Sequence, residues 1–329
     1  MHKQGLLDRA ELSVRALTGG QSNPTFRLSS GAQQFVLRKK PPGPLLPSAH
    51  AVDREYKVMK ALEGTDVPVP KMFAFCEDES VVGTPFFVME FLDGRVMVDQ
   101  SLPGMSPLQR RAIYEEMNRI IAALHRVNPA AVGLADFGRA GNYFGRQIAR
   151  WSRQYQDTRT QEIPELDALI EWLPAHIPPG EQTTIVHGDY RLDNLVFHPT
   201  EPRALGLLDW ELSTLGHPMA DFAYHCMSWH IPATLWRGIG GLDLQALGIP
   251  TEREYIDLYS RATGLHGFEH WDFYLAYNLF RMAAILQGIA RRAVDGTAAS
   301  ADAIETGSKA RPLAEIGWKY AQRYDASRK

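Results

Sequence analysis

The sequence predicts a bilobal α+β protein, in which a small antiparallel β-sheet lobe (residues 1–92) precedes a larger, mostly helical lobe (residues 93–329). Three observations lead to this prediction. Short apolar segments separated by Gly, Ser and Asn turns fill the first third of the chain, which is typical of strands joined by hairpins. Apolar residues in most of the remainder recur at helical spacing. Between the helical segments, a polar loop lies among short strands at residues 185–211.

The composition is that of a soluble globular protein. Hydrophobic residues make up 45% and charged residues 22% of the 329 residues, and the net charge of −3 gives no basic footprint for nucleic acid. Arg281 and two amide residues interrupt the most apolar run, residues 276–290, so we expect no membrane span. No signal-type segment follows Met1, and Cys76 and Cys226 have neither metal-ligand nor paired-motif spacing. We therefore expect a cytoplasmic protein with reduced thiols.

The first lobe is predicted to begin with three strands, at residues 12–18, 25–29 and 34–39. The turn between the first two contains Gly20, Ser22 and Asn23. Glycine there would let backbone N–H groups approach phosphate oxygens, as in a hairpin loop that covers a nucleotide. A plain hairpin turn explains the same residues, so the pattern gains weight only from the strand that follows it.

The third predicted strand places one cation toward the interior of the protein. Strand side chains alternate between two faces, so Arg38 lies on the same face as Val36, and Lys39 lies on the other. We expect Arg38 to face the functional site, and a solvated edge-strand arginine is the alternative. The rest of the lobe is predicted as a proline-rich connector, a helix and two strands, at residues 41–47, 51–62, 69–74 and 86–91.

Helical periodicity dominates the second lobe. Ser106-Pro107 supplies an N-cap and a first-turn proline, and apolar residues recur at helical spacing from Ile113 until Asn128-Pro129, which predicts one long helix. Five more helices are predicted, at residues 143–155, 164–173, 251–263, 268–294 and 301–324.

The loop at residues 187–194 gives the strongest chemical signal. Asp189 and Asn194 have the Asp-x-x-x-x-Asn spacing of a kinase catalytic loop, and Asp209 ends the apolar strand that comes next. In magnesium-dependent phosphoryl transfer, one carboxylate orients the attacking hydroxyl group, while an amide oxygen and a second carboxylate hold the metal. Asp189 is therefore predicted as the catalytic carboxylate, and Asn194 and Asp209 are predicted as the metal ligands.

Two neighbours of Asp189 are further catalytic candidates. Arg191 is placed to neutralise charge on the γ-phosphate, and solvation of the loop is its alternative role. His187 is expected to brace the loop by hydrogen bonds rather than to take protons.

Asp136-Phe137-Gly138 spells the metal-binding motif of protein kinases, but we interpret it as a turn. The metal-binding Asp must follow the catalytic loop, on a strand beside it. This triplet precedes that loop by about fifty residues and comes after a helix.

Taken together, these residues resemble the aminoglycoside phosphotransferase and choline kinase superfamily, which has a protein-kinase-like fold and carries His-Gly-Asp at this place. The resemblance implies ATP and Mg²⁺ as cofactors and a small hydroxylated molecule as substrate. It implies that Glu55 pairs with the third-strand cation, and that Glu90 and Phe91 offer backbone groups to adenine at a hinge between the lobes. It also gives Asp221 a supporting role beneath the catalytic loop.

Arg38 in place of the usual lysine resembles one subgroup, the kinase-like domain that is fused to acyl-CoA dehydrogenases in animals. From Cys226 to the end, 11 acids face 12 Lys and Arg residues, so the acidic excess that polycationic aminoglycosides need is absent. We predict a small-molecule hydroxyl kinase, and the subgroup alone suggests a hydroxyacyl-CoA. The alternatives are an aminoglycoside or amino-alcohol kinase and, in another class, a nucleotide-binding module without transferase activity.

Overall fold

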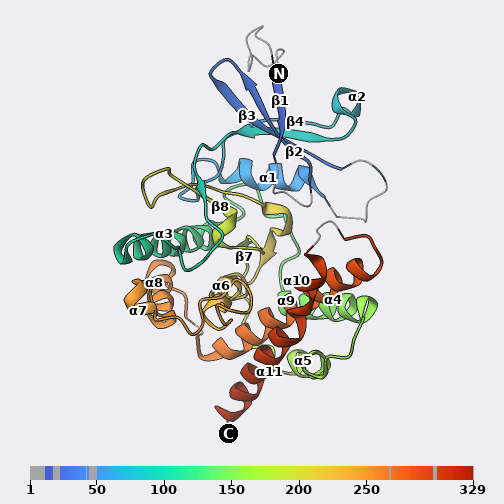
Figure 1. Ribbon diagram of the computed structural model, residues 1–329, viewed down its shortest axis with the longest axis vertical. Coiled ribbons are helices and arrows are strands. Elements are labelled where there is room, and N and C mark those ends of the chain that lie inside the picture. The colour runs from blue at the N-terminus through green and yellow to red at the C-terminus, as the bar shows by residue number, and fades with distance from the viewer. Residues whose placement is uncertain are drawn as a thin grey trace.

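The chain folds into the two predicted lobes, which lie one above the other in Figure 1. This computed structural model describes residues 12–17, 23–41, 43, 50–266, 268–298 and 302–328. A five-stranded antiparallel sheet forms the first lobe, and helices dominate the second. The predicted α+β bilobal fold is confirmed, whereas the division at residue 92 stays a prediction.

The sheet of the first lobe has the strand order β1-β2-β3-β5-β4. Its strands are β1 (Ser13–Ala16), β2 (Thr25–Ser30), β3 (Gln33–Lys39), β4 (Met72–Cys76) and β5 (Phe86–Glu90). The helix α1 (Val52–Leu62) packs against one face, where Tyr56 contacts the rings of Phe75 and Phe87. Phe35 and Val88 are buried on the opposite face. The short helix α2 (Glu79–Val82) lies between β4 and β5 in the chain.

β4 begins later than the sequence predicts. We expected a strand at residues 69–74, but pairing with β5 starts at Met72. Pro70 has no N–H group to donate to a neighbouring strand, so the ladder forms only beyond it.

Two small sheets of the second lobe hold the polar loop. In one of them, β8 (Leu195–Phe197) lies between β6 (Arg95–Val96) and β9 (Ala204–Leu207), and in the other β7 (Thr184–Val186) pairs with β10 (Thr214–Gly216). The loop at residues 187–194 therefore connects the two sheets, and Asp209 follows β9 closely. The sequence did not predict β6 and β10, because strands of two or three residues leave no periodic pattern.

The six predicted helices of the second lobe are present, the last of them divided in two, and the short helices α6 and α7 lie among them. They are α3 (Pro107–Arg126), α4 (Tyr143–Thr158), α5 (Pro164–Ala175), α6 (Pro218–Cys226), α7 (Leu244–Leu247), α8 (Glu252–Thr263), α9 (Trp271–Val294), α10 (Ala303–Ser308) and α11 (Ala310–Ala326). We expected a single helix at residues 301–324, which the structure divides into α10 and α11 at Lys309. Pro312 explains the new start, because proline is tolerated in a first helical turn but not in a helix interior.

The long helix α9 is the centre of the second lobe. It contacts α4, α5, α6, α10 and α11, and most of its residues are buried. Figure 1 shows it crossing the lower half of the molecule beside α10 and α4. No helix in the described part of the chain has the length and apolar character needed to cross a bilayer.

Candidate active site

Most of the predicted catalytic and metal-binding residues line one cavity of about 510 Å³. Arg38 enters it from β3 of the first lobe, and the other predicted residues come from the polar loop and the end of β9. One stripe of α9 closes the opposite side. The predicted residues that line it are Arg38, Asp189, Arg191, Asn194 and Asp209.

Side chains hold both carboxylate oxygens of Asp189. The Tyr224 hydroxyl donates a hydrogen bond to Oδ1, and Arg191 Nε lies 3.1 Å from the same oxygen. Asn194 Nδ2 donates to Oδ2 at 3.1 Å and to the Asp189 backbone carbonyl at 2.8 Å. The carboxylate is thus fixed in orientation at the wall of the cavity.

The Asp209 backbone adopts the left-handed conformation, with φ 65° and ψ 59°. A non-glycine residue there costs on the order of 1–2 kcal/mol, which neighbouring contacts must offset. The preceding residue, Leu208, donates its N–H to the Asn194 carbonyl at 2.8 Å, and its own carbonyl accepts from His187 Nε2 at 2.9 Å. These contacts attach the strand end to the polar loop and bring Asp209 and Asn194 to the same cavity.

His187 braces the loop, as expected. The Asp189 N–H donates to His187 Nδ1 at 3.2 Å, so the proton of the neutral ring is on Nε2 and is donated to Leu208. The side chain is buried, and both nitrogens are occupied. These contacts tie the loop to the strand end, and a part of His187 in catalysis stays a prediction.

The backbone conformation and the close surroundings of position 188 explain why this loop carries Gly where protein kinases carry Arg. Its φ is 83°, and a Cβ atom there would lie 2.7 Å from the Leu212 carbonyl oxygen. Only glycine satisfies both the conformation and the close approach.

Arg38 forms ion pairs with residues of both lobes. Its Nε lies 2.9 Å from Glu55 Oε2, and its Nη2 lies 3.2 Å from Asp209 Oδ1. Lys39 points away and donates to the Val82 carbonyl. Burial raises the pKa of Glu55 to about 7, with Asp209 adding to the rise and Arg38 opposing it. The predicted partner of Glu55 is thus found, whereas contact of either residue with a nucleotide stays a prediction.

Only part of the predicted nucleotide-covering turn lies within the residues that the structure describes. Gly20 and Ser22 lie outside the described residues. Asn23 is buried, and its amide donates to Glu55 Oε1 at 2.7 Å while its oxygen lies 3.0 Å from His50 Nδ1. The Asn23 side chain therefore supports Glu55, and contact of this turn with a nucleotide stays a prediction.

The predicted hinge residues do not line the cavity. The Glu90 N–H donates to the Lys71 carbonyl at 2.9 Å, so that group is already engaged. The Phe91 ring lies under the guanidinium of Arg27, at 4.4 Å. An adenine contact at this segment stays a prediction.

Asp221 supports the loop from below. It lies in the first turn of α6 and accepts from the backbone N–H groups of His187 and Gly188, at 2.7 and 2.9 Å. His125 Nε2 lies 3.2 Å from the same carboxylate. Burial alone would raise the pKa of Asp221, but these hydrogen bonds and His125 hold the pKa below its ordinary value.

Sequence reasoning missed three residues around Asp189. Tyr224 lies one helical turn beyond Asp221, a spacing that predicts the same helix face. Arg281 is buried on α9 and donates to the Gly188 carbonyl at 2.5 Å. The sequence did contain a signal for Arg281, because it is the one charged residue in an apolar helical run. A charge that is buried in this way requires a buried partner.

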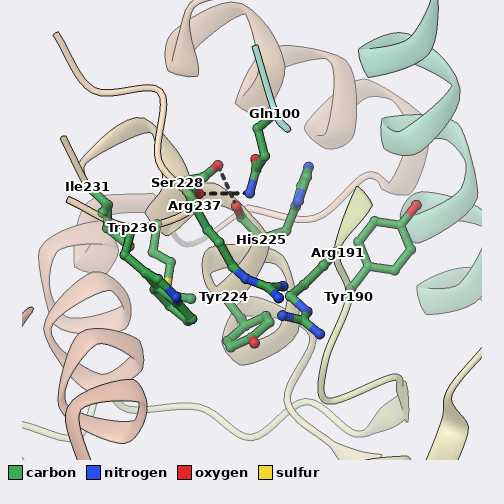
Figure 2. A pocket seen from close by; sticks show the side chains of 10 residues that line it. Gln100, Tyr190, Arg191, Tyr224, His225, Ser228, Ile231, Trp236 and Arg237 are labelled. Carbon is green, nitrogen blue, oxygen red and sulfur yellow. Dashed lines mark hydrogen bonds between the residues drawn. The ribbon is translucent and has the colours of Figure 1, made fainter. Parts of the chain in front are cut away.

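The third missed residue is Arg237, which has no comparable sequence signal. Its Nη1 lies 2.7 Å from Asp193 Oδ2, and its backbone carbonyl accepts from Gln100. Figure 2 shows Arg191, Arg237 and Tyr224 converging at a small adjoining cleft, with Trp236 beside them.

The kinase-like triplet at residues 136–138 is a turn, as expected. The Asp136 side chain is 79% exposed and pairs with Lys57 at 2.8 Å. It does not line the cavity that contains Asp209.

Comparison with known proteins gives the same identification. The profile of the phosphotransferase enzyme family matches residues 13–277. Acyl-CoA dehydrogenase family member 10 of Mus musculus is 47% identical over 92% of this chain and 28% of its own length. Family member 11 of Homo sapiens is 42% identical over 95% of this chain and 40% of its own length. The chain therefore spans well under half of these curated relatives.

Solved structures show the same fold. A candidate aminoglycoside phosphotransferase from Ralstonia eutropha JMP134 matches with a TM-score of 0.89 and 59% identity, covering 96% of this chain and 94% of that one. A Plasmodium vivax ethanolamine kinase matches with a TM-score of 0.56 and 11% identity, covering 92% and 81%. The latter likeness concerns the fold alone. With its catalytic-loop spacing, its two-lobed fold and the family match over most of its length, this chain belongs to the phosphotransferase enzyme family.

Proposed function

We propose that the protein transfers the γ-phosphoryl group of ATP to a hydroxyl group of a small molecule, in a magnesium-dependent reaction. The observation that carries the proposal is the meeting of Asp189, Asn194, Asp209 and Arg38 in one cavity. A hydroxyl-orienting carboxylate, two oxygen ligands and a cation are the groups that phosphoryl transfer requires.

The residues present fit magnesium and a nucleotide phosphate. Asn194 and Asp209 offer hard oxygen atoms, and magnesium usually takes one or two protein ligands and completes its shell with water and phosphate. The described residues contain no cluster of three or more His, Cys, Asp or Glu side chains that could hold a metal. Bound magnesium would supply charge neutralisation at the phosphates. Arg38, kept in place by Glu55, presents a guanidinium that can grip phosphate oxygens in two places.

Asp189 would orient the acceptor and accept its proton. The acceptor oxygen forms a bond to the γ-phosphorus while the bond from that phosphorus to the oxygen of ADP breaks, and the hydroxyl proton passes to the Asp189 carboxylate. Because the transition state is loose, the carboxylate has to position the hydroxyl more than to withdraw its proton early. Arg191, beside Asp189, is placed to balance the charge that accumulates there.

The charge of the cavity argues against a polycationic acceptor. Among the described lining residues, the arginines are Arg38, Arg191, Arg237, Arg281 and Arg292, and the acids are Asp189, Asp193, Asp209 and Glu211. No acidic surplus is available to hold an aminoglycoside, and a neutral or anionic acceptor fits better.

The wall contributed by α9 is apolar. Met282, Ile285 and Ile289 recur at helical spacing along the cavity, and Arg292 follows one turn later. An apolar chain with an anionic group suits this surface, which supports a hydroxyacyl-CoA as acceptor. The acyl-CoA dehydrogenase names of the relatives support the same substrate class.

A panel assay of ADP release tests this function. Wild-type protein, magnesium and ATP would be incubated with 4-hydroxyacyl-CoA thioesters, aminoglycosides and amino-alcohols, and mass spectrometry would identify the phosphorylated product. We expect transfer to the thioesters. Transfer to an aminoglycoside or amino-alcohol alone would replace the acceptor class, and ATP binding without any transfer would favour a nucleotide-binding module.

Asp189→Ala separates chemistry from binding. We expect the rate to fall by on the order of 10²–10⁴, the usual contribution of a positioned carboxylate, with the Kd for magnesium–ATP unchanged. Asp136→Ala serves as the matched control, because it removes an exposed acid outside the cavity. Full turnover by Asp189→Ala would contradict the assignment.

A further inference from the structure

The Tyr224 hydroxyl contacts the cavity in an unusual way for a buried phenol. Only 2% of Tyr224 is exposed, yet its hydroxyl donates to Asp189 Oδ1 at the cavity wall. Among the other buried tyrosines, Tyr114 and Tyr190 donate to backbone carbonyls, and Tyr255 and Tyr259 contact histidine side chains. Tyr224 therefore connects the interior of α6 directly to the proposed hydroxyl-orienting group.

The same helix holds the loop at two levels. Asp221 accepts from the backbone of the loop, and Tyr224, three residues later on the same face, holds the side chain of that loop. Arg281 secures the arrangement from α9, because its guanidinium lies 4.9 Å from the centre of the Tyr224 ring and donates to the Gly188 carbonyl. The phenol ring is thus enclosed between α6, α9 and the loop.

Orientation of a carboxylate is the property that such a contact controls. The terminal torsion of Asp is broad, so a carboxylate held by one partner samples many orientations. At Asp189, Asn194 holds Oδ2, and Tyr224 donates to Oδ1 with Arg191 Nε 3.1 Å from the same oxygen, so contacts on both oxygens define the plane of the group. A phenol is a neutral donor, so it orients the carboxylate without cancelling its charge.

We propose that Tyr224 is a positioning residue that acts through Asp189, directing one face of its carboxylate at the acceptor hydroxyl. This inference rests on the proposed function of Asp189. Tyr224 contributes to kcat and not to binding of ATP, because its hydroxyl contacts neither Arg38 nor the predicted metal ligands in the structure.

A double-mutant cycle on the rate tests the inference. Phosphoryl transfer from magnesium–ATP to a 4-hydroxyacyl-CoA, and hydrolysis of ATP without acceptor, would be measured for Tyr224→Phe, Asp189→Asn and the double variant. Tyr224→Phe should lower kcat by about tenfold, as expected for a lost hydrogen bond to a charged group, and leave KM for ATP within about twofold. In the Asp189→Asn background, the same change should have almost no further effect on the residual rate.

Tyr190→Phe is the matched control in the same loop. Its hydroxyl donates to the Met117 carbonyl, so the variant loses a buried hydrogen bond of similar kind without touching Asp189. It should lower the melting temperature to a similar extent as Tyr224→Phe but leave kcat in place. This comparison separates a structural effect from positioning.

The outcomes distinguish the two proposals. If wild-type protein transfers phosphate and Tyr224→Phe keeps full kcat, or lowers kcat equally in both backgrounds, the positioning role is wrong while the proposed function stands. If wild-type protein supports neither transfer nor hydrolysis, the proposed function fails first and the role of Tyr224 fails with it.

Discussion

The turn at residues 135–138 and the strand end at residues 207–211 each present an aspartate that sequence alone could assign to a metal. Asp136 has the more familiar letters around it, but it is exposed and pairs with Lys57. Asp209 lies in a left-handed backbone conformation, contacts Arg38 and lines the cavity with Asn194. The difference teaches that the contacts of the backbone and the loop that a carboxylate faces, rather than the letters around it, decide which of the two aspartates is the better candidate for a metal ligand.

The contacts that hold the strand end and the turn in place also differ. The strand end is fixed by the contacts of Leu208 with His187 and Asn194, and the loop itself is held by Asp221 and Arg281. The turn is anchored by the Phe137 side chain, which is buried in the core, and by Arg54, which donates to the Phe137 carbonyl at 2.6 Å. The Asp136 backbone is not in the left-handed region, whereas the left-handed backbone of Asp209 has to be held against strain.

The largest effect is expected at the strand end. Asp209→Asn keeps the left-handed conformation, which Asn tolerates, and removes the negative charge. We expect kcat to fall by on the order of 10³-fold, because a metal contributes several kcal/mol to charge stabilisation. Steady-state assays over a range of magnesium concentrations would measure this. Unchanged activity, with Asp136→Asn inactive instead, would reverse the comparison.

Support of the loop should matter next. Asp221→Ala leaves two backbone N–H groups and His125 without their buried acceptor, so we expect the free energy of unfolding to fall by about 3 kcal/mol. Chemical denaturation would measure it. A loss below about 0.5 kcal/mol would show that the loop is held by other contacts.

The pKa of Asp221 predicts how the stability of the protein changes at acid pH. Its pKa is lower in the folded protein than the ordinary value of 3.8, so the stabilisation is complete above that value and is lost as the pH falls through the folded pKa. Asp221→Ala should therefore flatten the decline of stability below about pH 4.

A smaller effect is expected where the lobes meet. Arg38→Lys keeps the charge, but one ammonium group cannot contact Glu55 and Asp209 with the geometry of a guanidinium. We expect kcat/KM for ATP to fall by about tenfold, the effect of one charge-assisted hydrogen bond. An increase on restoring the lysine that is usual in the superfamily would show that Arg38 serves another purpose.

The smallest effect is expected at the turn. Asp136→Ala removes an exposed ion pair with Lys57, and such pairs contribute little. The melting temperature should stay close to that of the wild-type protein, and turnover should be retained. Thermal denaturation alongside the ADP-release assay would check both, and lost turnover would overturn our interpretation of the triplet.

Much of the fold could be predicted because its elements are local. The spacing of nearby residues predicts the hairpin strands, the capped helix α3 and the apolar stripe of α9. Strand alternation alone was enough to choose Arg38 over Lys39. The predictions that failed depended on single residues whose effect is positional: Pro70 delays β4, and Pro312 starts α11. The strands β6 and β10 exist only because distant partners complete them.

The sequence by itself determined which polar groups the loop carries and the order of those groups along the chain. It identified Asp189, Asn194 and Asp209, because the spacing within one loop and one strand limits where those side chains can lie. It also gave the reason to dismiss Asp136.

Only the tertiary structure decided which residues surround that chemistry. Tyr224 on α6 and Arg281 on α9 reach Asp189 and Gly188 across 35 and 93 positions of the chain, and the Asn23 amide donates to Glu55. Helix packing sets these contacts, and a local pattern cannot encode which distant side chain fills a given space.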